Sequence, residues 1–97
     1  MNEKQWVLYV LECKDGTLYT GITDNFQRRF EAHNAGKGAK YTRGRGPLVL
    51  RYIESCENHS HALKREIAVK KLTKEQKLEL CRAFAKSLEH EKRSVSI

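Results

Sequence analysis

The segment QWVLYVLECKDGTLYTGIT, residues 5–23, decides the fold of this chain. It contains two apolar, β-branched and aromatic runs, 5–13 and 17–23, separated by Lys-Asp-Gly. Asp-Gly between two such runs is a strong signal for a tight turn between antiparallel strands, so the segment predicts a β-hairpin. Gly21 stands where strands prefer bulkier residues. Either this glycine only eases strain in the strand, or the missing side chain lets another group come close to the backbone.

After the hairpin, the chain predicts a helix over 25–36, with Asp24 or Asn25 as its N-cap and Gly36 at its end. The next segment, 36–47, is rich in glycine and in positive charge and is predicted to be a loop.

The second half of the chain predicts a third strand over 48–56, followed by two helices. Ser60 is expected to cap a helix over 61–72, and Thr73 to begin another that reaches residue 90. A frayed tail is expected over 91–97. The sum is an α+β fold, in which a three-stranded antiparallel sheet is flanked by helices.

Composition limits the function classes. With 97 residues, 39% hydrophobic and 32% charged, the chain predicts one folded domain over 1–97, with a core over about 5–80. It has no apolar run of the roughly 20 residues that cross a bilayer and no signal-peptide pattern, which predicts a cytoplasmic protein without a membrane partner. The net charge of +7 favours a polyanionic partner.

The cysteines are Cys13, Cys56 and Cys81, an odd number placed far apart. They imply neither a disulfide framework nor a Cys-x-x-Cys site, and buried or half-buried thiols are expected.

One carboxylate lies on an apolar helix face. On a helical wheel, the apolar arc of the helix over 61–72 holds Ala62, Leu63, Ile67 and Val69. Glu66 falls within this arc. Because an unpaired buried charge costs several kcal/mol, Glu66 must be paired, bind a cation, or lie at the lip of a cleft. An ion pair with a nearby lysine or arginine and a functional role both remain open.

Two further pairs of side chains are candidates for a site. Arg29 and His33 are four residues apart on one helix face, which is either a solvated basic surface or a grip for a phosphate group. Tyr9 and Tyr19 lie on paired strands, either as core residues or as neighbouring hydroxyls of a site. Gly21 points to the same strand face as Tyr19 and is expected to leave a recess beside that ring.

Taken in chain order, these candidate residues resemble the pattern of the GIY-YIG nuclease domain. Its two signatures correspond to VLY at 7–9, which lacks the glycine, and YTG at 19–21, and Arg29, His33 and Glu66 follow. The runs YVLECKDGTLYTGITDNFQRRFEAHNAGKGAKYTR and ALKREIAVKKL look most like the small stand-alone bacterial GIY-YIG proteins of the UPF0213 group.

The resemblance implies hydrolysis of phosphodiester bonds in DNA with one divalent ion, Mg²⁺ or Mn²⁺. By position, it implies that Glu66 binds the metal, Arg29 steadies the scissile phosphate, and His33 joins the paired tyrosines Tyr9 and Tyr19. One carboxylate can suffice, because Mg²⁺ keeps most of its waters. A tyrosine base, with an ordinary pKa of about 10, needs a cation beside it. Which tyrosine acts remains open.

The basic loop GKGAKYTRGRG, residues 36–46, is predicted to hold a nucleic-acid backbone. The expected nucleic-acid contacts are Lys37, Lys40, Arg43 and Arg45 to phosphates, Tyr41 to a base, and Gly21 at the point of close approach. We expect recognition of single-stranded or branched DNA rather than plain duplex, in DNA repair or processing, with RNA left open.

Two other functions are compatible with this sequence. One is a nucleic-acid-binding module of the same fold without turnover, because no asparagine follows Glu66, where endonucleases of the family commonly carry one. The other is a protein-interaction domain.

Overall fold

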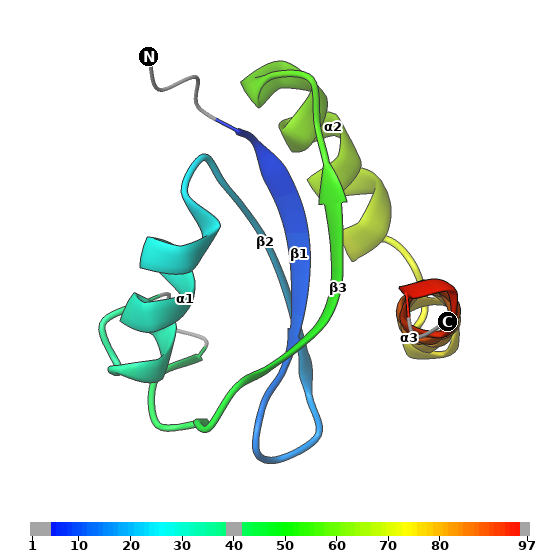
Figure 1. Ribbon diagram of the computed structural model, residues 1–97. Coiled ribbons are helices and arrows are strands. Elements are labelled where there is room, and N and C mark those ends of the chain that lie inside the picture. Colours follow the sequence, from blue (N-terminus) through cyan, green and yellow to red (C-terminus); the bar gives the residue numbers. More distant parts are fainter. Residues whose placement is uncertain (1–4, 39–41, 96–97) are drawn as a thin grey trace.

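A computed structural model describes residues 5–38 and 42–95 and confirms the α+β fold (Figure 1). The elements are β1 (Val7–Glu12), β2 (Leu18–Thr23), α1 (Phe26–Asn34), β3 (Val49–Ser55), α2 (His59–Lys70) and α3 (Lys74–Val95). The strands form an antiparallel sheet in the order β2-β1-β3. Helix α1 covers one face of the sheet, and α2 and α3 cover the other.

The β1–β2 hairpin forms at the predicted turn. Gly16 takes a left-handed backbone conformation with φ of 84°. The backbone N–H and the hydroxyl of Thr17 both donate to Oδ1 of Asp15, at 3.1 and 2.6 Å. The resulting register places Tyr9 opposite Gly21. This pairing positions the candidate site.

Strand β1 lies in the middle of the sheet and is buried on both faces, which accounts for its unbroken apolar run. Because side chains alternate along a strand, its residues divide between two clusters. Val7, Tyr9 and Leu11 pack toward Phe26 and Phe30 of α1. Leu8 and Val10 pack toward α2 and α3.

Helix α1 begins after Asn25, whose Oδ1 accepts from the backbone N–H of Arg28 at 3.2 Å. Of the two predicted caps, Asn25 is therefore the right one. The helix ends at Asn34, and Gly36 follows with φ of 77°, as a helix-ending glycine does.

Helix α2 begins at His59 rather than after Ser60, so the predicted cap at Ser60 is wrong. Asn58 has an extended backbone, and its Oδ1 accepts from the backbone N–H of His61 at 2.8 Å. Asparagine is one of the strongest N-caps, and it provides the hydrogen bond earlier in the chain.

The predicted apolar arc of α2 is also wrong in part. Ala62 and Val69 are buried, whereas Leu63 and Ile67 are 40% and 55% exposed. Residues seven apart lie on nearly the same side of a helix, so α2 meets the sheet along the narrow line that joins Ala62 and Val69. Glu66 therefore borders this contact line.

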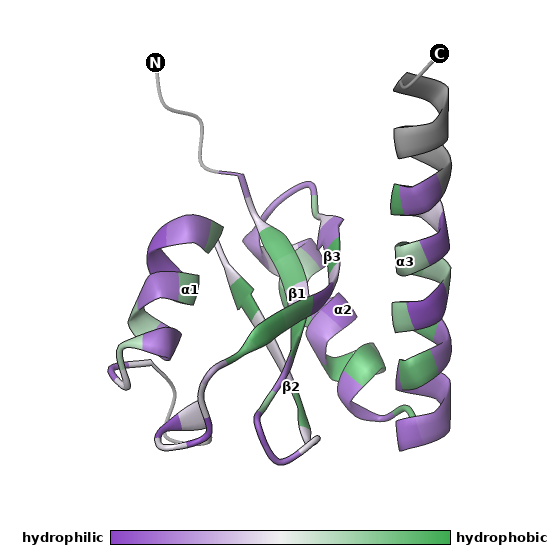
Figure 2. Ribbon diagram, turned by 60° about the horizontal axis from the view of Figure 1, so that its bottom comes forward, coloured by the Kyte–Doolittle hydropathy of each residue, from purple (hydrophilic) through white to green (hydrophobic). Residues whose placement is uncertain are grey.

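Helix α3 runs to Val95, so the expected frayed tail is wrong over 91–95, and residues 96–97 lie outside the described part. No glycine or proline interrupts this stretch, which is rich in helix-forming residues. Phe84 of α3 packs edge-on against Tyr52 of β3, and Figure 2 shows the hydrophobic residues of α3 mainly on its sheet side. No helix within the described ranges has the length and apolar character needed to cross a membrane.

The cysteines are free thiols, as expected. Cys13 and Cys56 are buried, and Cys81 is partly buried. Burial raises the pKa of the Cys56 and Cys81 thiols, which favours their protonated form.

One buried hydroxyl leads to a stability prediction. Thr20 of β2 is 4% exposed, and its Oγ1 has no hydrogen-bond partner among the residues that the structure describes. Because an unpaired buried hydroxyl costs about 1–3 kcal/mol, Thr20→Val is expected to raise the free energy of unfolding by about 1 kcal/mol in urea titrations. Thr42→Val is the control: its hydroxyl is bonded, so it should lower that free energy. A less stable Thr20→Val protein would contradict the prediction.

Candidate active site

Four aromatic rings meet on the α1 face of the sheet. The centroid of Tyr9 lies 6.3 Å from that of Tyr19, 5.4 Å from Phe26 and 5.9 Å from His33, and the Tyr19 and His33 centroids are 5.3 Å apart. The structure thus brings together both tyrosines and the histidine that the sequence singled out. Phe26 provides the apolar wall from the start of α1.

His33 is the buried centre of this cluster. Its Nε2 is hydrogen-bonded to the Tyr9 hydroxyl at 3.0 Å, and its Nδ1 to the Thr42 hydroxyl at 2.8 Å. Each of these three side chains is 1% exposed. A neutral imidazole satisfies both partners, because it donates through one nitrogen and accepts through the other. The chain Tyr9–His33–Thr42 is a continuous hydrogen-bonded path from β1 to the loop before β3.

The surroundings of this path set its protonation. Burial, together with the neighbouring Tyr19, raises the pKa of Tyr9 to about 12, against the opposing effect of Arg29. Burial and then the Arg29 charge lower the pKa of His33 below its ordinary value. At neutral pH, Tyr9 keeps its proton and His33 is uncharged.

The lowered pKa of His33 predicts a loss of stability in mild acid. The unfolded state, with a histidine pKa of about 6.5, binds the proton more tightly than the folded state does. The free energy of unfolding should therefore fall as the pH drops through about 6.5, and level off below the pKa of folded His33. Urea titrations between about pH 7.5 and 5.5 measure this. His33→Gln should flatten the slope, and an equal slope in both proteins would refute the assignment.

Arg29 lies beside the cluster, because its charge acts on both Tyr9 and His33. A groove of about 240 Å³ at the start of α1 is lined by Thr23, Asp24, Asn25, Arg28, Arg29 and Ala32. Arg28 is exposed, whereas Arg29 is partly buried. Arg28 is therefore part of a solvated basic surface. Arg29 and His33 instead belong with the tyrosine cluster.

Glu66 lies on α2, and its charge acts on Tyr9 of the cluster. Its side chain is 20% exposed, and its Oε2 lies 3.3 Å from Nζ of Lys70. Its carboxylate is also among the charges that raise the pKa of Tyr9. The two alternatives left open for Glu66 are therefore compatible: the residue forms an ion pair with Lys70, and its charge acts on Tyr9.

The donor set suits a metal ion that needs few protein ligands. Within residues 5–38 and 42–95, no group of three His, Cys, Asp or Glu side chains is placed to hold a metal. Mg²⁺ is commonly bound by one or two carboxylates with waters and substrate phosphate, so Glu66 alone fits that mode. Lys70 contacts Oε2 of this carboxylate, so it would compete with an ion for that oxygen.

Gly21 does not leave an open recess beside Tyr19, in contrast to the expectation from the sequence. A Cβ atom on Gly21 would lie 2.6 Å from the hydroxyl oxygen of Tyr9, 2.8 Å from its Cζ, and 2.9 Å from Cε2 of Tyr19. The space is filled because the register sets Tyr9 directly opposite Gly21. What comes close to the bare backbone is the Tyr9 phenol.

The predicted nucleic-acid contacts do not form one compact group as the aromatic cluster does. Lys37 and Arg43 are exposed on the connection between α1 and β3. Arg45 is held at the hairpin turn, where its Nη1 lies 2.9 Å from Oδ2 of Asp15. Lys40 and Tyr41 lie outside the described residues.

Two residues of the site were not predicted, Thr42 and Gly38. Thr42 orients the imidazole of His33, and a Cβ on Gly38 would overlap Nδ1 of that ring. Both lie in a loop, which has no periodic pattern from which a buried contact could be inferred. The available signal was a β-branched hydroxyl residue among lysines, arginines and glycines.

Comparisons with known proteins identify the family of this chain. The family model described as the GIY-YIG catalytic domain matches residues 5–79. A UPF0213 protein of Clostridium perfringens is 58% identical over 75% of this chain and 78% of its own length. One from Halobacterium salinarum is 56% identical over 72% of this chain and 91% of its own.

Two solution NMR structures are also similar. A UPF0213 protein from Bacillus halodurans is 43% identical, with a TM-score of 0.54, over 81% of this chain and 84% of that one. A protein from E. faecalis is 43% identical, with a TM-score of 0.60, over 87% of this chain and 90% of that one. With the catalytic-domain match over most of its length, the chain belongs to the GIY-YIG family of nuclease domains, which act on nucleic acids, and within it to the small UPF0213 proteins.

Proposed function

We propose that this protein is a divalent-metal-dependent nuclease that hydrolyses phosphodiester bonds in single-stranded or branched DNA. The observation that carries the proposal is the cluster of Tyr9, Tyr19, Arg29 and His33 beside the Glu66 carboxylate, in a GIY-YIG catalytic domain. Single-stranded and branched DNA arise in DNA repair and processing, which we infer to be its cytoplasmic role.

The charges of Arg29 and Glu66 suit them to two different roles in the reaction. Arg29, beside the tyrosines, is suited to grip the scissile phosphate and to offset the negative charge that develops on it. Glu66 would hold Mg²⁺ or Mn²⁺. When bound, such an ion supplies a Lewis-acid charge and lowers the pKa of a coordinated water.

Exposure separates the roles of the tyrosines. Tyr9 is 1% exposed and keeps its proton, with a pKa of about 12. Tyr19 is partly exposed and packs on the His33 ring. We therefore assign to Tyr19 the relay of a proton from the attacking water: its oxygen would accept that proton while its own hydroxyl proton passes to solvent, to which the residue is partly exposed. Tyr9 and His33 form the buried support that fixes its position.

The positive charge of the chain supports binding of a polyanion. The net charge is +7, and Lys37 and Arg43 are exposed beyond the end of α1. Contacts of this kind read the backbone rather than the bases, which suits recognition led by structure rather than by sequence.

A substrate panel tests the proposal. Single-stranded, flapped, nicked and duplex DNA, and single-stranded RNA, are incubated with Mg²⁺, Mn²⁺ or EDTA. We expect metal-dependent cleavage of single-stranded and flapped DNA. Glu66→Gln should lower the rate by about 10²–10³-fold, as for loss of a major electrostatic contribution. Glu79→Gln, an exposed carboxylate paired with Arg82, is the matched control and should cut normally. Intact substrates under all conditions, or normal cleavage by Glu66→Gln, would refute the proposal.

The ion pair between Glu66 and Lys70 favours a second candidate, a nucleic-acid-binding module without turnover. If this pair persists with DNA bound, Lys70 competes with a metal for Oε2 of Glu66. This candidate predicts DNA binding that weakens with salt and does not change with metal, and whose salt dependence falls when Lys37 or Arg43 is neutralised. Metal-dependent cleavage in the substrate panel excludes it.

A further inference from the structure

Helix α2 has few apolar contacts to fix its rotation about its own axis. Its buried residues are Ala62 and Val69, both small, whereas Leu63 and Ile67 are exposed. Two small side chains on one line define where the helix lies but resist rotation about that line only weakly. The orientation of Glu66, which borders the line, therefore depends on other contacts, one of which is the ring contact of His59, the first residue of α2, with Trp6 at 4.4 Å between centroids.

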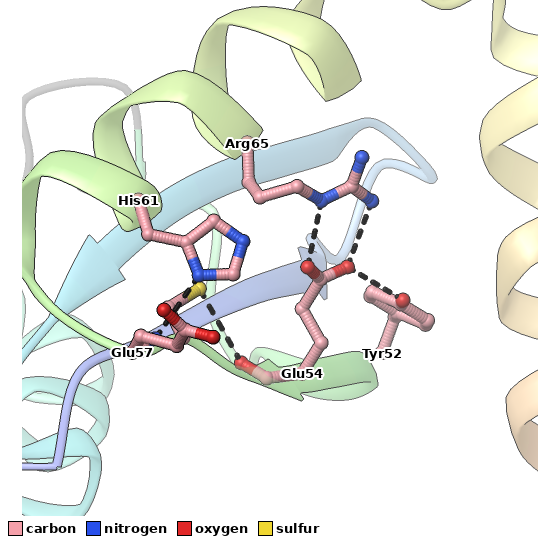
Figure 3. Close-up of polar contacts among 6 residues, drawn as sticks. Tyr52, Glu54, Glu57, His61 and Arg65 are labelled. Carbon is pink, nitrogen blue, oxygen red and sulfur yellow. Dashed lines mark hydrogen bonds and ion pairs between the residues drawn. The ribbon is translucent and has the colours of Figure 1, made fainter.

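Hydrogen-bonded side chains between α2 and β3 provide such contacts, and we call this set of residues the Arg65 clamp (Figure 3). It consists of Arg65 on α2 with Glu54 and Tyr52 on β3. Arg65 donates from Nε to Oε2 of Glu54 at 2.7 Å, and from Nη2 to Oε1 at 2.9 Å. The Tyr52 hydroxyl donates to the same Oε1 at 2.7 Å.

The clamp is stronger than an ordinary surface ion pair. A two-point arginine fork fixes both distance and direction, and the Glu54 side chain is only 20% exposed. The Arg65 fork lowers the pKa of Glu54, so the pair stays ionised at neutral pH. At the start of α2, the backbone N–H of Glu57 also donates to Nδ1 of His61, at 3.0 Å.

Arg65 and Glu66 are consecutive residues, so their side chains leave the helix about 100° apart. Arg65 reaches β3 on one side of the Ala62–Val69 line, and Glu66 leaves the helix on the other side, from which its charge acts on Tyr9. With a carboxylate roughly 6 Å from the helix axis, a rotation of about 20° displaces it by about 2 Å. A displacement of about 1 Å is enough to cost on the order of a hundredfold in a catalytic rate.

We propose that Arg65, held by Glu54 and Tyr52, is a positioning residue that sets the rotation of α2 and so holds Glu66 at the tyrosine cluster. The effect on cleavage rests on the proposed nuclease function. The effect on the orientation of α2 is independent of that function. Arg65 acts here only through Glu66.

The experiment compares Arg65→Lys and Glu54→Gln with the wild-type protein. Both variants keep most of the side-chain volume but lose the two-point fork. Glu12→Gln is the matched control, because Arg51 Nε donates to Glu12 at 2.6 Å between β3 and β1, away from α2. Tyr52→Phe removes one bond of the clamp and keeps the ring against Phe84, which provides a milder variant if the others fold poorly.

Three measurements are made on each folded protein, well below its thermal midpoint. Amide residual dipolar couplings along α2 report its rotation. Cleavage rates are measured as a function of Mn²⁺ concentration, and DNA affinity is measured without metal. We expect the clamp variants to shift the periodic pattern of the couplings, to raise the Mn²⁺ needed for half-maximal cleavage, and to cut at least about tenfold more slowly. DNA affinity should stay within about twofold, and Glu12→Gln should match the wild type.

Unchanged couplings in both clamp variants would overturn the proposal, as would normal cleavage with normal Mn²⁺ dependence. A merely structural role would lower the thermal midpoint but leave the couplings and the Mn²⁺ dependence of the folded protein unchanged, and this result would also overturn it. If the wild-type protein cuts no substrate, the proposed function fails, and the couplings alone then decide on the clamp.

Discussion

Tyr19→Phe is expected to slow DNA cleavage by about 10²–10⁴-fold, the usual range for loss of a general acid or base, with DNA affinity unchanged. The substitution removes a hydroxyl and keeps the ring that packs on His33 and Tyr9. The protein should therefore fold as before and bind substrate as before. Single-turnover cleavage rates at saturating enzyme measure the chemical step, and salt-dependent binding without metal measures affinity.

Tyr9→Phe is the informative comparison. It leaves Nε2 of His33 without its partner in a buried site, so it should lower the free energy of unfolding by about 1–3 kcal/mol. Its effect on the chemical step should be smaller than that of Tyr19→Phe, because Tyr9 is buried and holds its proton. If Tyr9→Phe abolishes cleavage in a fully folded protein while Tyr19→Phe cuts normally, the two roles are reversed.

Gly21→Ala is expected to lower the free energy of unfolding by about 3 kcal/mol, at the upper end of the range for overpacked cores. The new Cβ would lie 2.6 Å from the Tyr9 hydroxyl oxygen and 2.8 Å from its Cζ, so the ring must move. Tyr9 has little room to do so, because Phe26, His33 and Tyr19 surround it. Urea titration gives the loss in stability, and cleavage by the folded fraction should fall as the site is displaced.

Gly46→Ala is the matched control, since the nearest atom to a Cβ there is Oδ1 of Asn34 at 3.9 Å. It should change the free energy of unfolding by no more than about 0.5 kcal/mol. Combining Gly21→Ala with Tyr9→Phe removes the nearest clashing atom, so the double variant should lose less stability than the sum of the single losses. Additive losses would show that the phenol is not what fills the space beside Gly21.

The hairpin and the central strand could be predicted because their causes are local. Asp15-Gly16 specifies the turn, and the unbroken apolar run from Val7 to Leu11 reflects burial on both faces. The same logic brought Tyr9 and Tyr19 together across the pair. By contrast, the helical wheel of α2 wrongly assigned Leu63 to the core. A wheel shows which residues share a helix face, but it does not show how wide a strip of that face contacts the sheet.

The candidate site was predictable where helix or strand spacing defines it. His33 followed from its position on the first helix, but its burial depends on Thr42 and Gly38, which come from a loop. The sequence could show that Glu66 was unusual. It could not show that the residue lies near Tyr9 and pairs with Lys70, because both contacts depend on how α2 docks.

The central position of β1 gives the two halves of the site different local stabilities. Strand β1 is paired on both edges and covered on both faces, so it belongs to the part of the molecule that opens only when the whole protein unfolds. The Tyr9 phenol shares that persistence. Glu66 is carried by a helix that docks through Ala62, Val69 and the Arg65 clamp, so we expect α2 to detach in a smaller opening that leaves the sheet intact. The Tyr9 phenol is thus expected to outlast the carboxylate, so the lifetime of the complete site is set by how long α2 stays docked.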